Sequence, residues 1–182
     1  MATHEFLQFC DLRALQGNGV RSELDRLVKM RFLTPYKAEL VRIDELERFA
    51  KSPLLLELLS AKKIYRELRF NSMLPAALFT EDESLRAMFS EKSILVQGVI
   101  DCLYESESGE LVLVDYKTDR LDKRKGAEAA KRELILQHKE QLYYYALAIQ
   151  RMFGKAPDRI LLYSLCLSDV AVLSKDDIDL PR

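Results

Sequence analysis

Three charged residues stand inside segments that are otherwise apolar. Asp101 follows ILVQGVI, and Asp115 and Lys117 lie within LVLVDYKT. A carboxylate among apolar residues is costly to bury unless something compensates its charge. Two carboxylates on adjacent strands can share one divalent cation, because Mg²⁺ prefers carboxylate, carbonyl and water oxygens. Positions i and i+2 of a strand face the same side, so we expect Lys117 beside the same site as Asp115.

This set of residues suits the hydrolysis of a phosphodiester bond. That reaction needs a positioned metal-bound water and neutralisation of charge on the phosphate. The tripeptide Asp-x-Lys alone more often forms an ion pair at a strand end. Gly98 precedes Asp101 by three residues, which gives the rarer arrangement G-x-x-D followed by D-x-K. The pattern therefore predicts a metal-dependent hydrolase site.

The first third of the chain is predicted to be helical. Apolar residues recur at helical spacing in 4–15 and 20–32, and the segment Gly17-Asn18-Gly19 separates the two stretches. Three further helix starts are predicted at Thr34-Pro35, at Asp44 with Glu47 as a capping box, and at Ser52-Pro53.

The rest of the chain alternates between strand and helix signals. Segment 63–73 alternates with Ile64, Arg66, Leu68 and Phe70 on one face, and predicts a strand. Segments 94–104 and 111–118 predict an antiparallel hairpin joined by a turn at 105–109. Other predicted elements are a loop or short helix at 81–91, an exposed basic loop at 120–131, a helix at 133–153 ended by Gly154, and strands at 159–167 and 170–173. This order predicts an α/β fold with a mixed central sheet flanked by helices.

Composition limits the class of protein. The 182 residues are enough for one domain with a core, and the net charge of −1 is low for a protein that grips long duplexes by itself. A metal ion can supply positive charge at an acidic site. The longest apolar runs, such as 160–163, fall far short of the roughly 20 residues that cross a bilayer, and no signal-peptide pattern begins the chain. We expect a cytoplasmic location.

The three cysteines are widely separated in the sequence. Cys10, Cys102 and Cys166 form no C-x-x-C pair, and they are expected to be small buried residues. Three cysteines cannot supply a four-cysteine iron–sulfur site, so no iron–sulfur cluster is expected. The phosphate-binding pattern G-x-x-x-x-G-K-[ST] does not occur, so no nucleotide site is expected.

Four motifs together resemble a known family. The segments GVID (98–101) and VDYKTD (114–119) are similar to the active-site motif of PD-(D/E)XK nucleases of the RecB-like branch. QLYYY (141–145) resembles the Q-x-x-x-Y helix motif of that branch. YRE (65–67) and ATHEFLQ (2–8) resemble its glutamate-bearing strand and its histidine-bearing helix. The motifs stand in the expected order over nearly the whole chain, and the likeness extends to the C-terminal nuclease domains of AddAB-type helicase–nucleases.

The resemblance implies a role for each matching residue. His4, Asp101 and Asp115 would be metal ligands, together with the backbone carbonyl of Tyr116. Lys117 would orient the attacking water or stabilise the transition state. Glu67 would be catalytic, and Gln141 and Tyr145 would support the site or contact DNA. The plainer interpretations are a solvent-exposed histidine for His4, a surface charge for Glu67, and ordinary helix packing for Gln141 and Tyr145. His138 matches no motif and is predicted to lie on the surface.

The resemblance also implies an organisation and a set of partners. Residues 1–62 would form a helical segment that contributes His4, and 63–182 the PD-(D/E)XK restriction-endonuclease-like core, together as one domain. Met1 stands where relatives carry threonine, so the chain is expected to be a fragment of a larger helicase–nuclease. The cofactor would be Mg²⁺, with Mn²⁺ as a substitute. The partners would be single-stranded DNA delivered by a helicase and an AddB-like subunit, in exonucleolytic double-strand-break repair and recombination.

Alternatives to this hypothesis remain at the level of sequence. The chain could be a weakly active or inactive nuclease-fold module that guides DNA or docks a partner protein. It could also belong to the iron–sulfur exonucleases that share the core, although the cysteine count argues against this. The basic residues of 120–132 are candidates for phosphate contacts, but the acidic residues among them suit a solvated loop equally well. These basic residues are Arg120, Lys123, Arg124, Lys125, Lys131 and Arg132.

Overall fold

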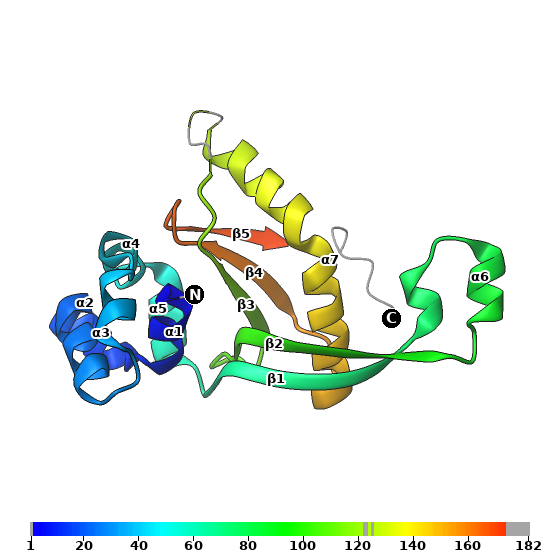
Figure 1. Ribbon diagram of the computed structural model, residues 1–182, viewed down its shortest axis with the longest axis horizontal. Coiled ribbons are helices and arrows are strands. Elements are labelled where there is room, and N and C mark those ends of the chain that lie inside the picture. The colour runs from blue at the N-terminus through cyan, green and yellow to red at the C-terminus, as the bar shows by residue number, and fades with distance from the viewer. Residues whose placement is uncertain (1, 122–123, 125, 174–182) are drawn as a thin grey trace.

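The computed structural model describes residues 2–121, 124 and 126–173, and its centre is a five-stranded mixed sheet (Figure 1). The strand order is β1-β2-β3-β4-β5, and every neighbouring pair is antiparallel except β3 and β4, which are parallel. The predicted α/β fold with a mixed sheet is therefore confirmed. The strands are β1 (Lys63–Pro75), β2 (Ser93–Glu105), β3 (Leu111–Lys117), β4 (Arg159–Ser164) and β5 (Asp169–Leu173).

Helices cover both faces of the central strands. The N-terminal helices gather at the end where β1 begins, and β1 and β2 extend away from them as a long ribbon (Figure 1). Among the residues described, no helix has both the length and the apolar character needed to span a membrane. The end cluster is α1 (Ala2–Phe9), α2 (Leu12–Lys29), α3 (Pro35–Glu39), α4 (Ile43–Phe49) and α5 (Pro53–Ser60). The ribbon ends in η1 (Ala76–Phe79) and α6 (Glu83–Met88), and α7 (Ala127–Phe153) packs on the sheet.

Most of the predicted helix starts are confirmed. The side chains of Thr34 and Ser52 accept hydrogen bonds from the backbone three residues on, as N-caps do. The break predicted near Gly19 is present, because its φ of 83° interrupts the helical backbone inside α2. The helix predicted over 4–15 is instead two helices, since Asp11 caps the start of α2 through the backbone N–H groups of Arg13 and Ala14.

Two boundary predictions are wrong. The capping box at Asp44 is absent: α4 already begins at Ile43, and Asp44 lies in its first turn, where the helix dipole favours an acidic side chain. The basic segment is only partly a loop, because α7 begins at Ala127, six residues earlier than expected. Lys131 is therefore helical and pairs with Glu128 and with Asp169 of β5, at 3.3 and 2.7 Å. The predicted loop residues Lys123 and Lys125 lie outside the described residues.

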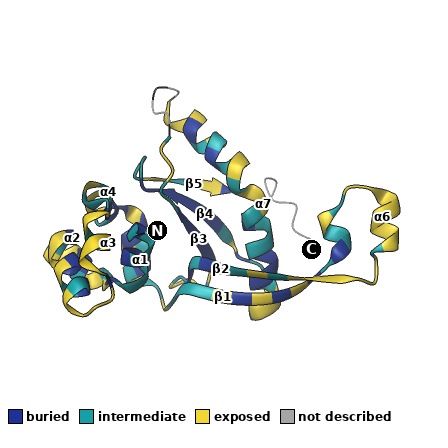
Figure 2. Cartoon of the chain, in the orientation of Figure 1, coloured by how far each residue is buried: buried dark blue, intermediate teal, exposed yellow. Residues whose placement is uncertain are grey.

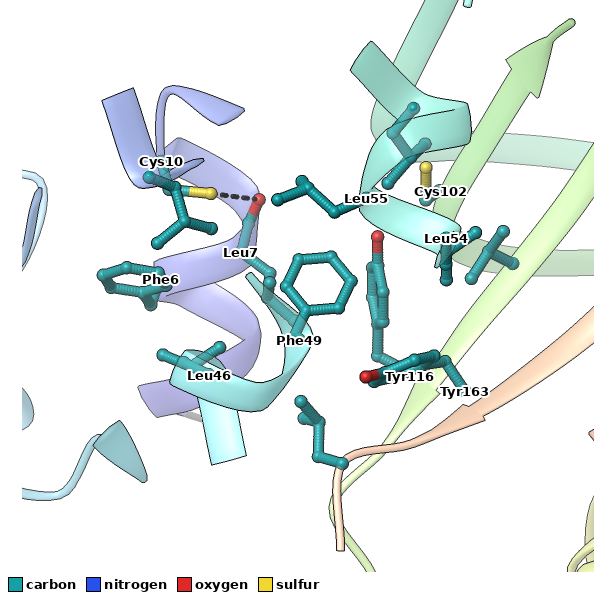
Figure 3. Close-up of a cluster of buried hydrophobic side chains, with 14 of the residues drawn as sticks. Phe6, Leu7, Cys10, Leu46, Phe49, Leu54, Leu55, Cys102, Tyr116 and Tyr163 are labelled. Atoms are coloured by element: carbon teal, nitrogen blue, oxygen red, sulfur yellow. Dashed lines mark hydrogen bonds between the residues drawn. The ribbon is translucent and has the colours of Figure 1, made fainter. Parts of the chain in front are cut away.

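The sheet separates two hydrophobic cores. The first, here called the helix-side core, joins α1, α2, α4 and α5 to one face of the central strands. Its aromatic centre is Phe49, whose ring meets Tyr116 and Tyr163 edge-on at centroid distances of 5.8 and 5.2 Å (Figure 3). The second, the α7-side core, packs Leu134, Leu142 and their neighbours on α7 against the opposite face. Buried positions concentrate in these central strands, whereas the far end of the ribbon is largely exposed (Figure 2).

The face of the sheet toward which side chains point changes along β1 and β2. Ile64 packs with the helix-side core, but Leu68 and Phe70 pack with the α7-side core, so the predicted single face for these residues is wrong. The change occurs at Glu67, which has a positive φ of 50° that a regular pleated strand does not adopt. In β2 the same change falls at Asp101, between Ile100 of the α7-side core and Cys102 of the helix-side core.

Two of the three cysteines are buried, as predicted. Cys10 and Cys102 are buried in the helix-side core, and burial raises the pKa of each thiol to about 12. Cys166 is only partly buried, because it lies in the turn that joins β4 to β5 rather than in a strand.

Candidate active site

Asp101 and Asp115 lie opposite each other where two strands separate. The ladder between β2 and β3 ends with the pair Cys102 and Val114, and each aspartate is the next residue beyond that pair. The backbone N–H of Tyr116 donates to Asp101 Oδ2 at 2.8 Å, so a side chain continues the contact where the backbone pairing stops. Tyr116 thus links the site to the core, because its backbone N–H contacts Asp101 while its ring packs in the helix-side core (Figure 3). The point where β2 and β3 separate, here called the fork, thus places the carboxylates of Asp101 and Asp115 next to each other.

Asp115 is a buried carboxylate whose charge is only partly compensated. It is 2% exposed, and the ammonium of Lys117 approaches its Oδ2 at 2.7 Å. Burial first, and then the nearby charge of Asp101, raise the pKa of Asp115 to about 6. Its Oδ2 atom is buried and, despite the close ammonium, accepts no hydrogen bond of good geometry. This oxygen therefore retains the capacity to bind a cation.

A chain of hydrogen bonds from α7 holds Lys117. Its ammonium donates to Gln141 Oε1 at 3.0 Å, and Gln141 Nε2 donates to the hydroxyl of Tyr145 at 2.7 Å. Gln141 and Tyr145 are four residues apart, which places them on the same side of a helix. Burial raises the pKa of Tyr145, and the charges of Asp115 and Asp101 raise it further. Both motif residues of α7 thus face the fork rather than only packing in the core.

His4 reaches the fork from the helical cluster. Its Nδ1 lies 3.5 Å from Asp101 Oδ2, although 97 residues separate the two in the sequence. The position of α1 is held by Arg66 of β1, whose Nη1 donates to the carbonyls of Leu7 and Cys10 at 3.0 and 2.6 Å. These carbonyls end α1, where a cation is favourable to the helix dipole. This role of Arg66 was not predicted, although a charged residue on a half-apolar strand was a signal for it.

Glu67 lies next to Asp101 on the neighbouring strand. Their positions match across the β1–β2 register, between the pairs Arg66 with Cys102 and Leu68 with Ile100. Burial first, and then the charge of Asp101, raise the pKa of the Glu67 carboxyl. The positive φ of Glu67 is unusual for a non-glycine residue, and such strain is typical of functional sites.

The close packing of Gly98 explains its place in the motif. Gly98 pairs with Phe70 across the ribbon, and a Cβ atom built on Gly98 would lie 2.6 Å from the Phe70 ring and 3.3 Å from the Tyr145 ring. The two rings meet edge-on with centroids 5.7 Å apart. Glycine at this position therefore allows Phe70 to support Tyr145, a role for Phe70 that the sequence analysis did not identify.

His138 is half-buried, so the prediction of a surface position holds only in part. One face of α7 turns its ring toward the loop after β3, where Nε2 is buried 3.7 Å from Asp119 Oδ2. Burial first, and then the charge of Lys117, lower the pKa of His138. Its imidazole is therefore a half-buried neighbour of the site.

The donor atoms at the fork suit a hard divalent cation, but they do not form a complete coordination site. Within the described ranges, no group of three or more His, Cys, Asp or Glu side chains has the geometry of a metal site. Instead the two carboxylates are paired, Asp101 with His4 and Asp115 with Lys117. The buried Oδ2 of Asp115, whose contact with Lys117 lacks good hydrogen-bond geometry, is the atom that fits a cation, since carboxylate oxygens are the ligands that Mg²⁺ prefers. Binding would have to release Asp115 from Lys117.

Comparison with known proteins gives one consistent answer. The family model of the PD-(D/E)XK nuclease superfamily matches residues 4–175. The chain is 31% identical over 179 residues to an ATP-dependent helicase/nuclease subunit of Clostridium perfringens strain SM101, and the match covers 96% of the chain and 14% of that relative. The protein of the same name from Heliobacterium modesticaldum is 40% identical over 120 residues, which is 65% of the chain and 8% of the relative. The chain thus spans only a small part of the length of these relatives.

Proposed function

This chain belongs to the PD-(D/E)XK nuclease superfamily, and we therefore propose that it hydrolyses phosphodiester bonds of DNA with a bound Mg²⁺ or Mn²⁺ ion. The proposed ligands are His4, Asp101, Asp115 and the backbone carbonyl of Tyr116. The observation that carries the proposal is the fork between β2 and β3, where Asp101 and Asp115 lie next to each other and the ammonium of Lys117 approaches a buried oxygen of Asp115 at 2.7 Å. Carboxylates flanking a lysine supply what this reaction needs.

Each residue of the fork would have its own role in the hydrolysis. A bound divalent ion supplies Lewis acidity and lowers the pKa of water. With Asp115 holding the ion, the ammonium of Lys117 would be released from this carboxylate and could face the negative charge that develops on the phosphate. Gln141, oriented by Tyr145, keeps the ammonium in place. Glu67 has a raised pKa and so holds a proton beside Asp101 more readily than an exposed glutamate.

The relatives support a larger setting for this activity. Because the similar proteins are named as subunits of an ATP-dependent helicase/nuclease, we propose that the chain is the nuclease module of a helicase–nuclease in double-strand-break repair and recombination. In this setting 1–62 would supply His4, 63–182 the catalytic core, and an AddB-like protein would be the partner. The module would act as an exonuclease on single strands that the helicase delivers. DNA as the substrate agrees with the cytoplasmic location expected from the sequence.

The test is cleavage of single-stranded DNA with and without Mg²⁺. Asp115→Ala and Lys117→Ala should lose nearly all activity, whereas Asp25→Ala, a change of an exposed aspartate on α2, should keep it. Far-UV circular dichroism of each variant shows that it is folded. Equal cleavage by all four proteins would refute the proposal.

The paired state of the two carboxylates favours one other candidate function. If Lys117 and His4 hold Asp115 and Asp101 more firmly than a cation can, the chain would be a nuclease-fold module that guides DNA or docks a partner protein. Titration calorimetry with Mn²⁺ separates the two hypotheses. Binding that Asp115→Ala abolishes supports the nuclease, and a folded wild type that binds no Mn²⁺ supports the module.

A further inference from the structure

An open groove of about 620 Å³ continues from the fork toward the helical cluster. One end is formed by His4, Glu67 and Asp101, which belong to the site already described. The other end is formed by α3 and the residue after it. Tyr36, Lys37 and Leu40 supply this wall. Whatever occupies the groove therefore lies next to the proposed reaction centre.

The wall that α3 supplies is unusual for a helix. None of the five residues of α3 is buried. Tyr36 is 71% exposed and Leu40 54% exposed. A single exposed aromatic residue is common on protein surfaces and by itself indicates nothing. Here the exposed ring shares a groove with the carboxylates of the site, so its π-face is available to something bound there.

The charges of the groove decide which part of a nucleotide it accepts. Glu5, Glu67 and Asp101 make it acidic, and the ammonium of Lys37 is already paired with Glu5 Oε2 at 2.6 Å. At the α3 end, the ammonium that could attract a phosphate is held by Glu5, whereas Tyr36 offers an aromatic face to an uncharged nucleobase. The groove is therefore suited to a base, and the phosphate is left to the fork and Lys117.

We propose that this groove binds one unpaired nucleobase, stacked on Tyr36, beside the phosphate that is cleaved. The inference rests on the proposed function, because it takes the fork as the place of cleavage. A base inside a duplex is stacked and paired, and unstacking it costs energy before it can reach Tyr36. The Tyr36 site would thus make the nuclease prefer single strands and place the scissile phosphate at a fixed distance from the stacked base.

The size of the effect follows from the strength of stacking. Removal of an aromatic ring on which a base stacks weakens binding by about 5- to 150-fold per base. Tyr36→Ala should therefore raise the KM for single-stranded DNA by a factor in that range and change kcat little. Tyr36→Phe should behave as wild type, since it keeps the ring. Met88→Ala is the control, because it removes a large apolar side chain that is 59% exposed on α6, at the far end of the ribbon.

An abasic scan tests the inference directly. Single-stranded oligonucleotides that each lack one base, at successive positions, are cleaved by wild type and by Tyr36→Ala. We expect one position at which the missing base slows wild type, and at which the Tyr36→Ala variant is indifferent. If every position slows both proteins equally, or if Tyr36→Ala cleaves intact oligonucleotides as well as wild type does, the inference is wrong.

A second measurement separates this inference from the proposed function. Oligonucleotides with 2-aminopurine at the position found, or at successive positions, are bound with Ca²⁺ in place of Mg²⁺, and stacking on Tyr36 quenches their fluorescence. A protein that cleaves no DNA but shows quenching that Tyr36→Ala abolishes would overturn the nuclease and keep the base site. A protein that cleaves DNA without any Tyr36-dependent position or quenching would keep the nuclease and overturn the base site.

Discussion

Replacement of Asp115 by asparagine should abolish cleavage and, at the same time, stabilise the metal-free protein above pH 6. The reason is that Asp115 is 2% exposed and its pKa is raised from 3.8 to about 6 by burial and by Asp101. The folded state therefore binds this proton more tightly than the unfolded chain does. Its contribution to stability is complete below about pH 4 and is lost as the pH rises through about 6.

The magnitude follows from the same pKa. Ionised Asp115 costs the folded state about 3 kcal/mol relative to a carboxyl with an unshifted pKa. Asparagine carries no charge, and its amide oxygen can remain beside the ammonium of Lys117, although the ion pair is lost. We therefore expect Asp115→Asn to raise the free energy of unfolding by about 1–3 kcal/mol at pH 8, and by nearly nothing at pH 4.

Urea unfolding followed by circular dichroism, in EDTA and at several pH values between 4 and 8, measures this difference. Asp25→Asn is the control, because that aspartate is exposed on α2 and should show no pH-dependent gain. The reasoning is refuted if Asp115→Asn is no more stable than wild type at pH 8, or if its advantage is the same at pH 4.

Three further predictions address the metal, the motif glycine and the second layer of the site. Mg²⁺ at about 100 times its Kd should stabilise wild type by about 3 kcal/mol and leave Asp115→Asn unchanged, as measured by the Tm in thermal unfolding. Gly98→Ala should lower the free energy of unfolding by about 1–3 kcal/mol and reduce activity, because the new Cβ meets the Phe70 ring. Gly17→Ala is the control: its Cβ would meet nothing within 4 Å, so urea unfolding should show no change or a gain of up to about 1 kcal/mol. Gln141→Ala should lower kcat by about 10- to 100-fold with little change in stability, because it frees the ammonium of Lys117; an unchanged kcat would remove Gln141 from the site.

Much of the fold was already determined by local sequence. Proline after an N-capping residue started α3 and α5, and Gly154 in a left-handed conformation ended α7, because these residues act through their own backbone geometry. The hairpin of β2 and β3 and the family membership likewise followed from patterns within short segments. The capping box at Asp44 failed because several acidic and polar residues there can begin a helix, and tertiary packing selects among them.

The sequence by itself also identified Asp101, Asp115 and Lys117 as a candidate site, since charges inside apolar strands need a reason to be there. Only the tertiary structure decided how they meet. The fork forms because β3 leaves β2 after Val114, and His4 arrives because Arg66 holds α1 against β1. Neither event leaves a periodic signal, because each depends on contacts between segments far apart in the chain.

The reversal of faces at Glu67 shows the limit most clearly. Strict alternation placed Ile64 and Leu68 on one side, but a single residue with positive φ puts them in different cores. Local sequence determines which residues seek burial. The strain at one backbone position is tolerated only when the packing of both cores outweighs it, and that balance exists only in the folded molecule.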